Sequence, residues 1–290
     1  MFNHYFTRNK TLTLFFLFTL SWTWLCGLIP ILLGNIETPL GSFIFYFGGG
    51  APSVVGLLIV CLTYSKQNRR DYFSRCFSLR KMGWKWPLWS FCVFSIIAIV
   101  GIFISTNLLG HVMPGLSWLK SICQKPYTLP VFLFLSYLSG PINEEFGWRG
   151  YSLDHLLVRF GWIKANLILG TIWTIWHLFW YMNPQQSQYE WLQRSLFDAL
   201  IYLPATILLC FVVWIVYIKT NRSILAGATV HMLRNLLSSQ LLSPISVEVS
   251  TVLKLVEIGV YLIITIYFIR STTFKKQLET SIREIKAQYY

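Results

Sequence analysis

The sequence predicts an all-α protein that is embedded in a membrane as a bundle of about eight transmembrane helices. Only 12% of its 290 residues are charged, about half the share that is usual in a soluble chain, and 55% are hydrophobic. The hydrophobic residues are gathered in long runs. Each run is near the ~20 residues with which a helix crosses about 30 Å of hydrocarbon.

The first run, residues 11–33, is too long for the core of a signal peptide, and we interpret it as an uncleaved span. The second run, residues 42–64, contains three glycines and Pro52, which predict close helix packing and a kink. No linker divides the chain, so we predict one integral membrane domain over residues 1–290. The further candidate spans are residues 87–109, 129–148, 162–182, 196–218, 224–242 and 249–269.

The basic residues predict the orientation of the bundle. If the spans alternate in direction, 18 of the 24 lysines and arginines fall on one side, seven of them in a loop over residues 66–85. The opposite loops hold only Lys120, Lys125 and Arg194. By the positive-inside rule, both termini are expected in the cytoplasm. The charged tail, residues 275–286, is expected to be a solvated or surface-lying helix.

Two classes of function are disfavoured by composition. The net charge of +13 is accounted for by cytoplasmic loops, so we expect membrane lipid rather than nucleic acid as a partner. The six cysteines are scattered without a C-x-x-C spacing. This pattern indicates neither a disulfide framework nor a cysteine metal site.

Residues 140–150 place two carboxylates and an arginine inside an apolar segment. Such groups cost roughly 2.5 to 3.5 kcal/mol each at membrane depth, which makes them candidates for function. Glu145 and Arg149 stand four residues apart and share a helix face, so they are expected to pair. Glu144 is rotated by about 100° from them and stays available for chemistry. The alternative is an ion pair that only locks helices together.

Two further polar groups lie within predicted spans. His177 lies in the fifth span, and His231 shares a helix face with Asn235 in the seventh. Histidine suits proton transfer near neutral pH and also binds metals. The alternatives are a packing histidine and polar contacts between helices. Arg234 and Lys254 also fall within spans, so not every buried charge needs to be catalytic.

Together these residues resemble the CAAX protease and bacteriocin-processing (CPBP) family of intramembrane proteases. The hallmarks of that family are E-E-x-x-x-R, an aromatic residue followed by x-x-x-H, and H-x-x-x-N on successive membrane helices. The resemblance covers roughly residues 43–236, and the motif-bearing core is about residues 129–242. This chain reads Glu144-Glu145-x-x-x-Arg149, Trp173-x-x-x-His177 and His231-x-x-x-Asn235. Tryptophan stands where the family usually has phenylalanine.

The resemblance implies an endopeptidase that hydrolyses a membrane-associated protein or peptide in an intramembrane cavity, here in a bacterial plasma membrane. Glu144 would be the general base, assisted by His177. His231 and Asn235 would hold the water or the oxyanion. The adjacent ion pair would support the site, and Trp173 would form an aromatic wall. Substrate sequence, prenylation and oligomeric state are not indicated.

The residues leave open whether a metal is bound. A catalytic metal would make the protein a metalloprotease. Glu144, His177 and His231 are three residues of the right type to hold one divalent metal such as zinc with an open position. The common zinc-protease signature H-E-x-x-H is absent. We therefore expect no tightly bound metal.

A non-hydrolytic membrane protein is the alternative function, either a transporter or a bacteriocin-immunity or scaffold protein on the same fold. Transporters often contain internal repeats. No repeat is seen here, and the motif residues are intact, so hydrolysis is favoured.

The depths of the motif residues pose a problem for straight helices. At about 1.5 Å per residue, His177 lies roughly 22 Å and His231 roughly 10 Å from the cytoplasmic ends of their spans. Glu144 in a straight fourth span would lie near the cytoplasmic surface. Gly140-Pro141 is expected to break that helix and let it restart deeper, which is tolerated only beside a cavity.

Overall fold

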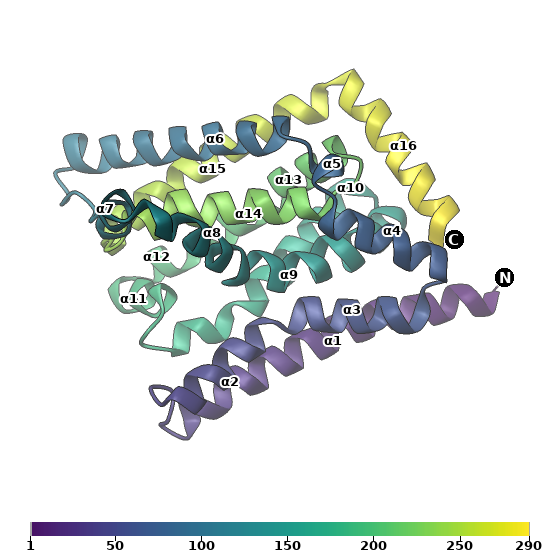
Figure 1. Ribbon diagram of the computed structural model, residues 1–290, viewed down its shortest axis with the longest axis horizontal. Coiled ribbons are helices and arrows are strands. Elements are labelled where there is room, and N and C mark those ends of the chain that lie inside the picture. The colour runs from purple at the N-terminus through teal and green to yellow at the C-terminus, as the bar shows by residue number, and fades with distance from the viewer. Residues whose placement is uncertain (1, 290) are drawn as a thin grey trace.

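The protein is a bundle of helices, and the computed structural model describes residues 2–289, with only the backbone for residues 2–9 (Figure 1). No strand occurs in this described part, which confirms the all-α prediction. The helices of the first half are α1 (Phe2–Leu32), α2 (Pro39–Gly49), α3 (Ala51–Thr63), α4 (Lys66–Phe77), α5 (Leu79–Met82), α6 (Lys85–Phe103), η1 (Ile104–Leu108), α7 (Ser117–Gln124), η2 (Pro126–Thr128) and α8 (Leu129–Leu138). Those of the second half are α9 (Pro141–Gly147), η3 (Trp148–Ser152), α10 (Leu153–Trp176), η4 (Leu178–Met182), α11 (Ser187–Arg194), α12 (Leu196–Leu200), α13 (Tyr202–Lys219), α14 (Ile224–Ser238), η5 (Gln240–Leu242), α15 (Val247–Arg270) and α16 (Thr272–Tyr289).

Membrane-capable helices are present, but fewer than the eight spans predicted. Five segments of the described chain are long and apolar enough to cross a membrane, or six if α2 and α3, bent by 52° at Gly50, count as one. The predicted seventh span is too short for this test, because α14 has only 15 residues. The predicted fourth and fifth spans count as one segment, Pro126–Met182.

That segment folds back on itself, so it holds both predicted spans. The indole of Trp173 donates a hydrogen bond to Glu144, 29 residues earlier. In one straight helix these residues would be about 43 Å apart. The reversal lies at Gly161, whose φ of 70° is in the left-handed region that glycine adopts readily.

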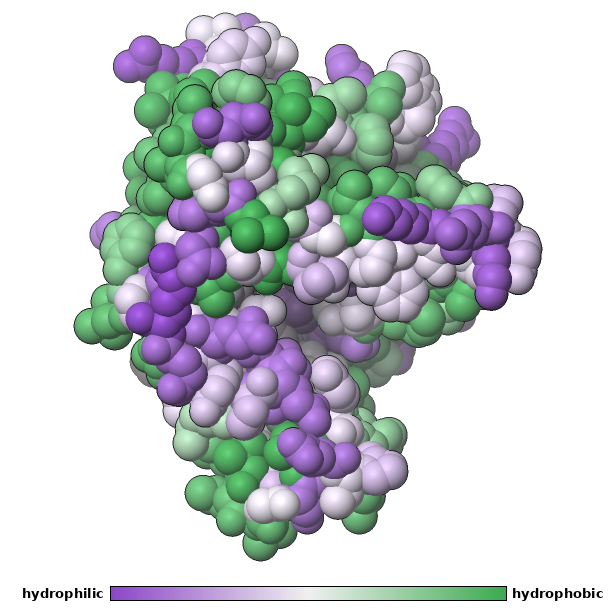
Figure 2. Space-filling model, turned by 90° about the vertical axis from the view of Figure 1, so that its left-hand side faces the viewer, coloured by the Kyte–Doolittle hydropathy of each residue, from purple (hydrophilic) through white to green (hydrophobic). Residues whose placement is uncertain are grey.

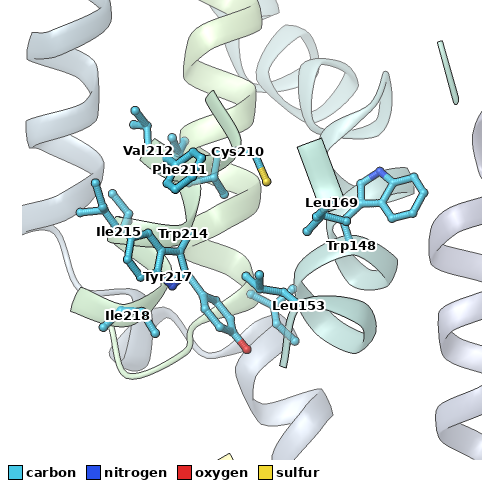
Figure 3. Close-up of a cluster of buried hydrophobic side chains, with 14 of the residues drawn as sticks. Trp148, Leu153, Leu169, Cys210, Phe211, Val212, Trp214, Ile215, Tyr217 and Ile218 are labelled. Atoms are coloured by element: carbon cyan, nitrogen blue, oxygen red, sulfur yellow. The ribbon is translucent and has the colours of Figure 1, made fainter. Parts of the chain in front are cut away.

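Helix α13 contributes most of the labelled side chains in the buried cluster of Figure 3. Every residue from Leu209 to Ile218 is buried, whereas α1, α6 and α15 each leave large apolar side chains exposed. It packs against α10, α14 and α15. Trp214 stacks on Trp162 of α10 with ring centroids 5.4 Å apart. A helix that is apolar all round either lies in the core of a large protein or spans a membrane.

The sequence predicted a basic loop over residues 66–85, but most of this segment forms the two helices α4 and α5. Arg75 is only 2% exposed and donates hydrogen bonds to Asp71, Tyr217 and Tyr289. Tyr289 belongs to α16, the predicted C-terminal helix, which closes this end of the bundle (Figure 1). Part of the basic charge therefore has a structural role.

Helix α9, which carries Glu144, is held against α3 by backbone contact. A Cβ atom at Gly147 would lie 2.1 Å from the carbonyl oxygen of Pro52, and one at Gly56 would lie 2.9 Å from the Cα of Gly147. The hydroxyl of Ser53 donates a 2.6 Å hydrogen bond to the carbonyl of Ile142. Small residues allow such close approach of membrane helices.

Replacing Gly147 by alanine is expected to separate α3 from α9 and lower the thermal unfolding midpoint, with most activity lost. Backbone atoms cannot yield to the added methyl group as a flexible side chain would. Gly259→Ala is the matched control, because nothing lies within 4 Å of the added Cβ in α15. An unchanged midpoint in Gly147→Ala would show that the helices are not in this contact.

Candidate active site

The helix break predicted at Gly140-Pro141 is present and brings Glu144 into the bundle. Helix α8 ends at Leu138 and α9 begins at Pro141. A cavity of about 300 Å³ lies beside α9, α10 and α14. The predicted catalytic residues all line it, namely Glu144, His177, His231 and Asn235, and so does Trp173.

The predicted ion pair of Glu145 and Arg149 is present, and Glu145 also contacts His231. Both side chains are fully buried, with Arg149 Nη1 2.8 Å from Glu145 Oε1. The same oxygen lies 3.0 Å from Nδ1 of His231. Because a carboxylate only accepts, Nδ1 carries a hydrogen, and Nε2 of His231 is left for other partners. Sequence spacing did not reveal this contact.

Glu144 turns away from that pair, as the helical offset predicted, and meets Trp173. The indole Nε1 donates a 2.6 Å hydrogen bond to Glu144 Oε2. The other oxygen, Oε1, lies 3.0 Å from where a Cβ atom of Gly140 would be. Arg149 stacks over the Trp173 ring at 4.5 Å. Trp173 is therefore more than the aromatic wall expected from sequence, since phenylalanine has no N–H to donate.

His177 ends α10 and is oriented by its own helix. Its Nδ1 lies 2.8 Å from the carbonyl oxygen of Trp173, one turn earlier. A carbonyl oxygen only accepts, so Nδ1 carries the hydrogen and Nε2 of the neutral ring is an acceptor. The ring contacts Tyr202 at 5.4 Å and Trp176 at 4.6 Å.

The cavity reaches the end of the bundle that carries α7 and α11, at the left of Figure 1. Figure 2 faces this end and shows polar residues around a hollow. Ser187 and Gln240 line the cavity and also an adjoining groove of about 750 Å³. The groove is mostly apolar, with side chains that include Trp118, Ile122, Tyr127, Val131, Phe132 and Leu135.

The three candidate metal ligands do not form a metal centre in this arrangement. In the part of the chain that the structure describes, no three histidine, cysteine, aspartate or glutamate side chains are grouped to hold an ion. His231 is engaged through Nδ1 with Glu145, and Glu144 through Oε2 with Trp173. Each of these bonds leaves one ligand atom available, namely Nε2 of His231 and Oε1 of Glu144. The divalent metal therefore stays an untested prediction.

A second polar cluster in the cavity was not identified from sequence as part of the site. Arg234 of α14 forms two hydrogen bonds with Glu257 of α15, at 3.0 and 2.9 Å. Lys254, one turn before Glu257, also lines the cavity. The charges were visible in predicted spans, but no spacing rule connects residues 23 positions apart on different helices.

Comparison with known proteins identifies the same region. The profile of the family described as type II CAAX prenyl endopeptidase Rce1-like matches residues 126–237. CAAX prenyl protease 2 of Methanococcus maripaludis is 24% identical over 230 residues, which are 77% of this chain and 82% of that protein.

The matched region contains every motif residue from Glu144 to Asn235, so the similarity and the cavity concern the same part of the chain. Together they define an endopeptidase, a hydrolase that is integral to the membrane. Both comparisons support the resemblance to the CPBP family that the motifs indicated.

Proposed function

We propose that the protein hydrolyses a peptide bond of a membrane-associated protein or peptide with a water molecule activated by Glu144 and His177. One observation carries the proposal. Three helices from different parts of the chain each contribute a motif residue to a single cavity, and that cavity is polar although it lies within an apolar bundle. Such a constellation suits hydrolysis better than transport or a scaffold role.

Glu144 acts as the general base. Its Oε2 is held by the Trp173 indole, so Oε1 takes the proton from water. Nε2 of His177 accepts the second hydrogen bond of that water, because Nδ1 is engaged with a backbone carbonyl. A positioned base typically contributes about 10² to 10⁴ in rate.

The hydroxide then forms a bond to the substrate carbonyl carbon, and the carbonyl oxygen becomes an oxyanion. The Asn235 amide donates a hydrogen bond to it, and His231 adds a second donor when its Nε2 is protonated. The Glu145 carboxylate at Nδ1 stabilises that protonated form of His231. When the C–N bond breaks, Glu144 returns its proton to the leaving amine.

The adjoining apolar groove supports a substrate that carries an apolar group beside the scissile bond. Its side chains offer a dry surface next to the polar cavity, and the two share four lining residues. A prenylated cysteine near a C-a-a-X terminus has this character. The name of the archaeal relative favours the same class.

Comparative sequencing of peptide termini in membranes tests the proposal. Cells that contain the intact protein should show new termini that are absent from cells with Glu144→Gln at equal abundance. Gly259→Ala serves as the active control, because it lies away from the cavity. Identical termini in all three membranes would refute hydrolysis.

The side from which substrate enters follows from the charge distribution. The cavity reaches the end of the bundle with few basic residues, opposite α4 and α16 (Figure 1). If the basic end is cytoplasmic, the cavity opens outward, and both termini stay inside. Met1 and Tyr290 themselves lie outside the described residues.

Alkaline phosphatase inserted after Gln186, at the cavity end, is expected to be active, because the enzyme folds only outside the cytoplasm. The same reporter after Tyr290 should be inactive. A cytoplasmic fluorescent reporter at both positions gives the reciprocal control. The same result at both positions would contradict the topology, and exchanged results would reverse the orientation and direct the cavity inward.

A further inference from the structure

Four helices meet around one lysine at the basic end of the bundle. Lys219 is the last residue of α13 and is partly buried. Its Nζ lies 5.9 Å from the ring centroid of Trp86, near the start of α6. It also lies 5.8 and 5.6 Å from the rings of Phe268 and Phe274, on the adjoining ends of α15 and α16. A cation within about 6 Å of a ring centroid is attracted by the π electrons, so these rings hold the ammonium group in place.

A second lysine shares the same indole. The Nζ of Lys85, the first residue of α6, also lies 5.9 Å from the ring centroid of Trp86. The two ammonium groups therefore flank one ring, and their charges repel each other. Two like charges on separate helices are held together here by an aromatic cluster, which makes the space beside them attractive for an anion.

The protein itself does not supply that anion. Asp71 and Asp154, the aspartates of this end, form their ion pairs with other basic residues. Glu279 and Glu284 are exposed on α16 and form no ion pair with either lysine. Among the residues that the structure describes, the two ammonium groups thus have no carboxylate within ion-pair distance.

Both lysines lie where membrane-capable segments end. Lys85 begins the segment Lys85–Leu108, and Lys219 ends the segment Leu196–Lys219. The phosphate groups of phospholipids lie just beyond the hydrocarbon at such segment ends, where tryptophan is also enriched. Basic pockets between transmembrane helices bind the headgroups of anionic lipids. The chemistry of this pocket therefore matches a lipid phosphate, with aromatic rings beside it for the glycerol and the first acyl carbons.

We propose that Lys85 and Lys219 together bind the phosphate of one anionic phospholipid, whose glycerol and acyl carbons pack on Trp86. A zwitterionic phospholipid brings an ammonium group of its own and compensates the two lysines less well. The bound lipid connects α6 with α13, the buried helix that packs against α10. It stabilises the bundle from a place outside the catalytic cavity, which other residues line. The inference does not depend on the proposed peptidase function.

Native mass spectrometry of the full chain, stripped of lipid in detergent, tests this site. The probes are phosphatidylglycerol and phosphatidylcholine with identical acyl chains, added in separate titrations. The first phosphatidylglycerol should bind about tenfold or more tightly than the first phosphatidylcholine. The double variant Lys85→Gln with Lys219→Gln should remove this preference, and the corresponding double arginine variant should retain it. Lys66→Gln with Arg80→Gln is the matched control, because it removes two exposed positive charges from the same end, and it should keep the preference.

The rise of the unfolding midpoint on adding phosphatidylglycerol is the second readout, since lysines with a purely structural role would give no such rise. It should occur in the unmodified protein and in the control, and be lost in the glutamine variant. Equal affinities for the two lipids in the unmodified protein would overturn the proposal, and so would a preference that survives in the glutamine variant. An equal loss in the control would show diffuse attraction to the basic end instead of a site. If excess inorganic phosphate displaces the lipid, the pocket binds free phosphate and the assignment to a phospholipid is wrong.

Discussion

Replacing Glu144 by glutamine is expected to lower the rate of peptide hydrolysis by about 10² to 10⁴-fold while the protein remains folded. Glutamine keeps the size of the side chain and an oxygen that accepts from the Trp173 indole. It cannot take a proton from water. The unfolding midpoint and the affinity for substrate peptides should therefore stay near those of the unmodified protein. Cleavage of a substrate identified from membranes, followed at saturating concentration, measures the loss.

The control for this experiment is Glu279→Gln, which makes the same chemical change on the exposed face of α16. It should leave both activity and stability unchanged. If Glu144→Gln were fully active and the Glu145 variant were stable but inert, the roles assigned to the two carboxylates would be reversed. Glu145 would then be the base.

Replacing Glu145 by glutamine is expected to destabilise the protein strongly. Arg149 is fully buried, and among the described residues Glu145 is the one carboxylate with which it forms an ion pair. Removing one member of a buried pair costs about 3 to 5 kcal/mol, because an uncompensated charge is left inside. The unfolding midpoint, measured in one detergent or lipid for all variants, should fall accordingly, and activity should fall with it.

The double variant Glu145→Gln with Arg149→Met separates stability from catalysis. Removing the arginine leaves no orphan charge, so much of the lost stability should return. Activity should not return, because His231 still lacks the carboxylate at Nδ1. Recovery of both properties together would show that Glu145 serves stability alone. If stability does not recover, Glu145 does not stabilise the protein through its ion pair with Arg149.

The sequence by itself determined the helical membrane character and the pairing of Glu145 with Arg149. Long apolar runs leave a chain few alternatives in lipid, since backbone groups must be satisfied within each segment. The ion pair could be predicted because residues four apart meet on any helix. The break at Gly140-Pro141 was equally local, since proline cannot continue the hydrogen-bond ladder. The family resemblance came from the same short spacings.

Only the tertiary structure decided which polar groups touch across helices. Trp173 holds Glu144 and Glu145 holds His231 because α9, α10 and α14 are rotated to face one cavity. Their rotation and depth depend on packing, such as the backbone contact of α9 with α3, which no single segment encodes. The burial of a basic residue was equally hidden from the sequence. Arg75 was counted as a loop charge, but it is buried in a polar network. Contacts between distant segments are set by the sum of many packing energies, whereas spacing along one helix follows from its fixed geometry.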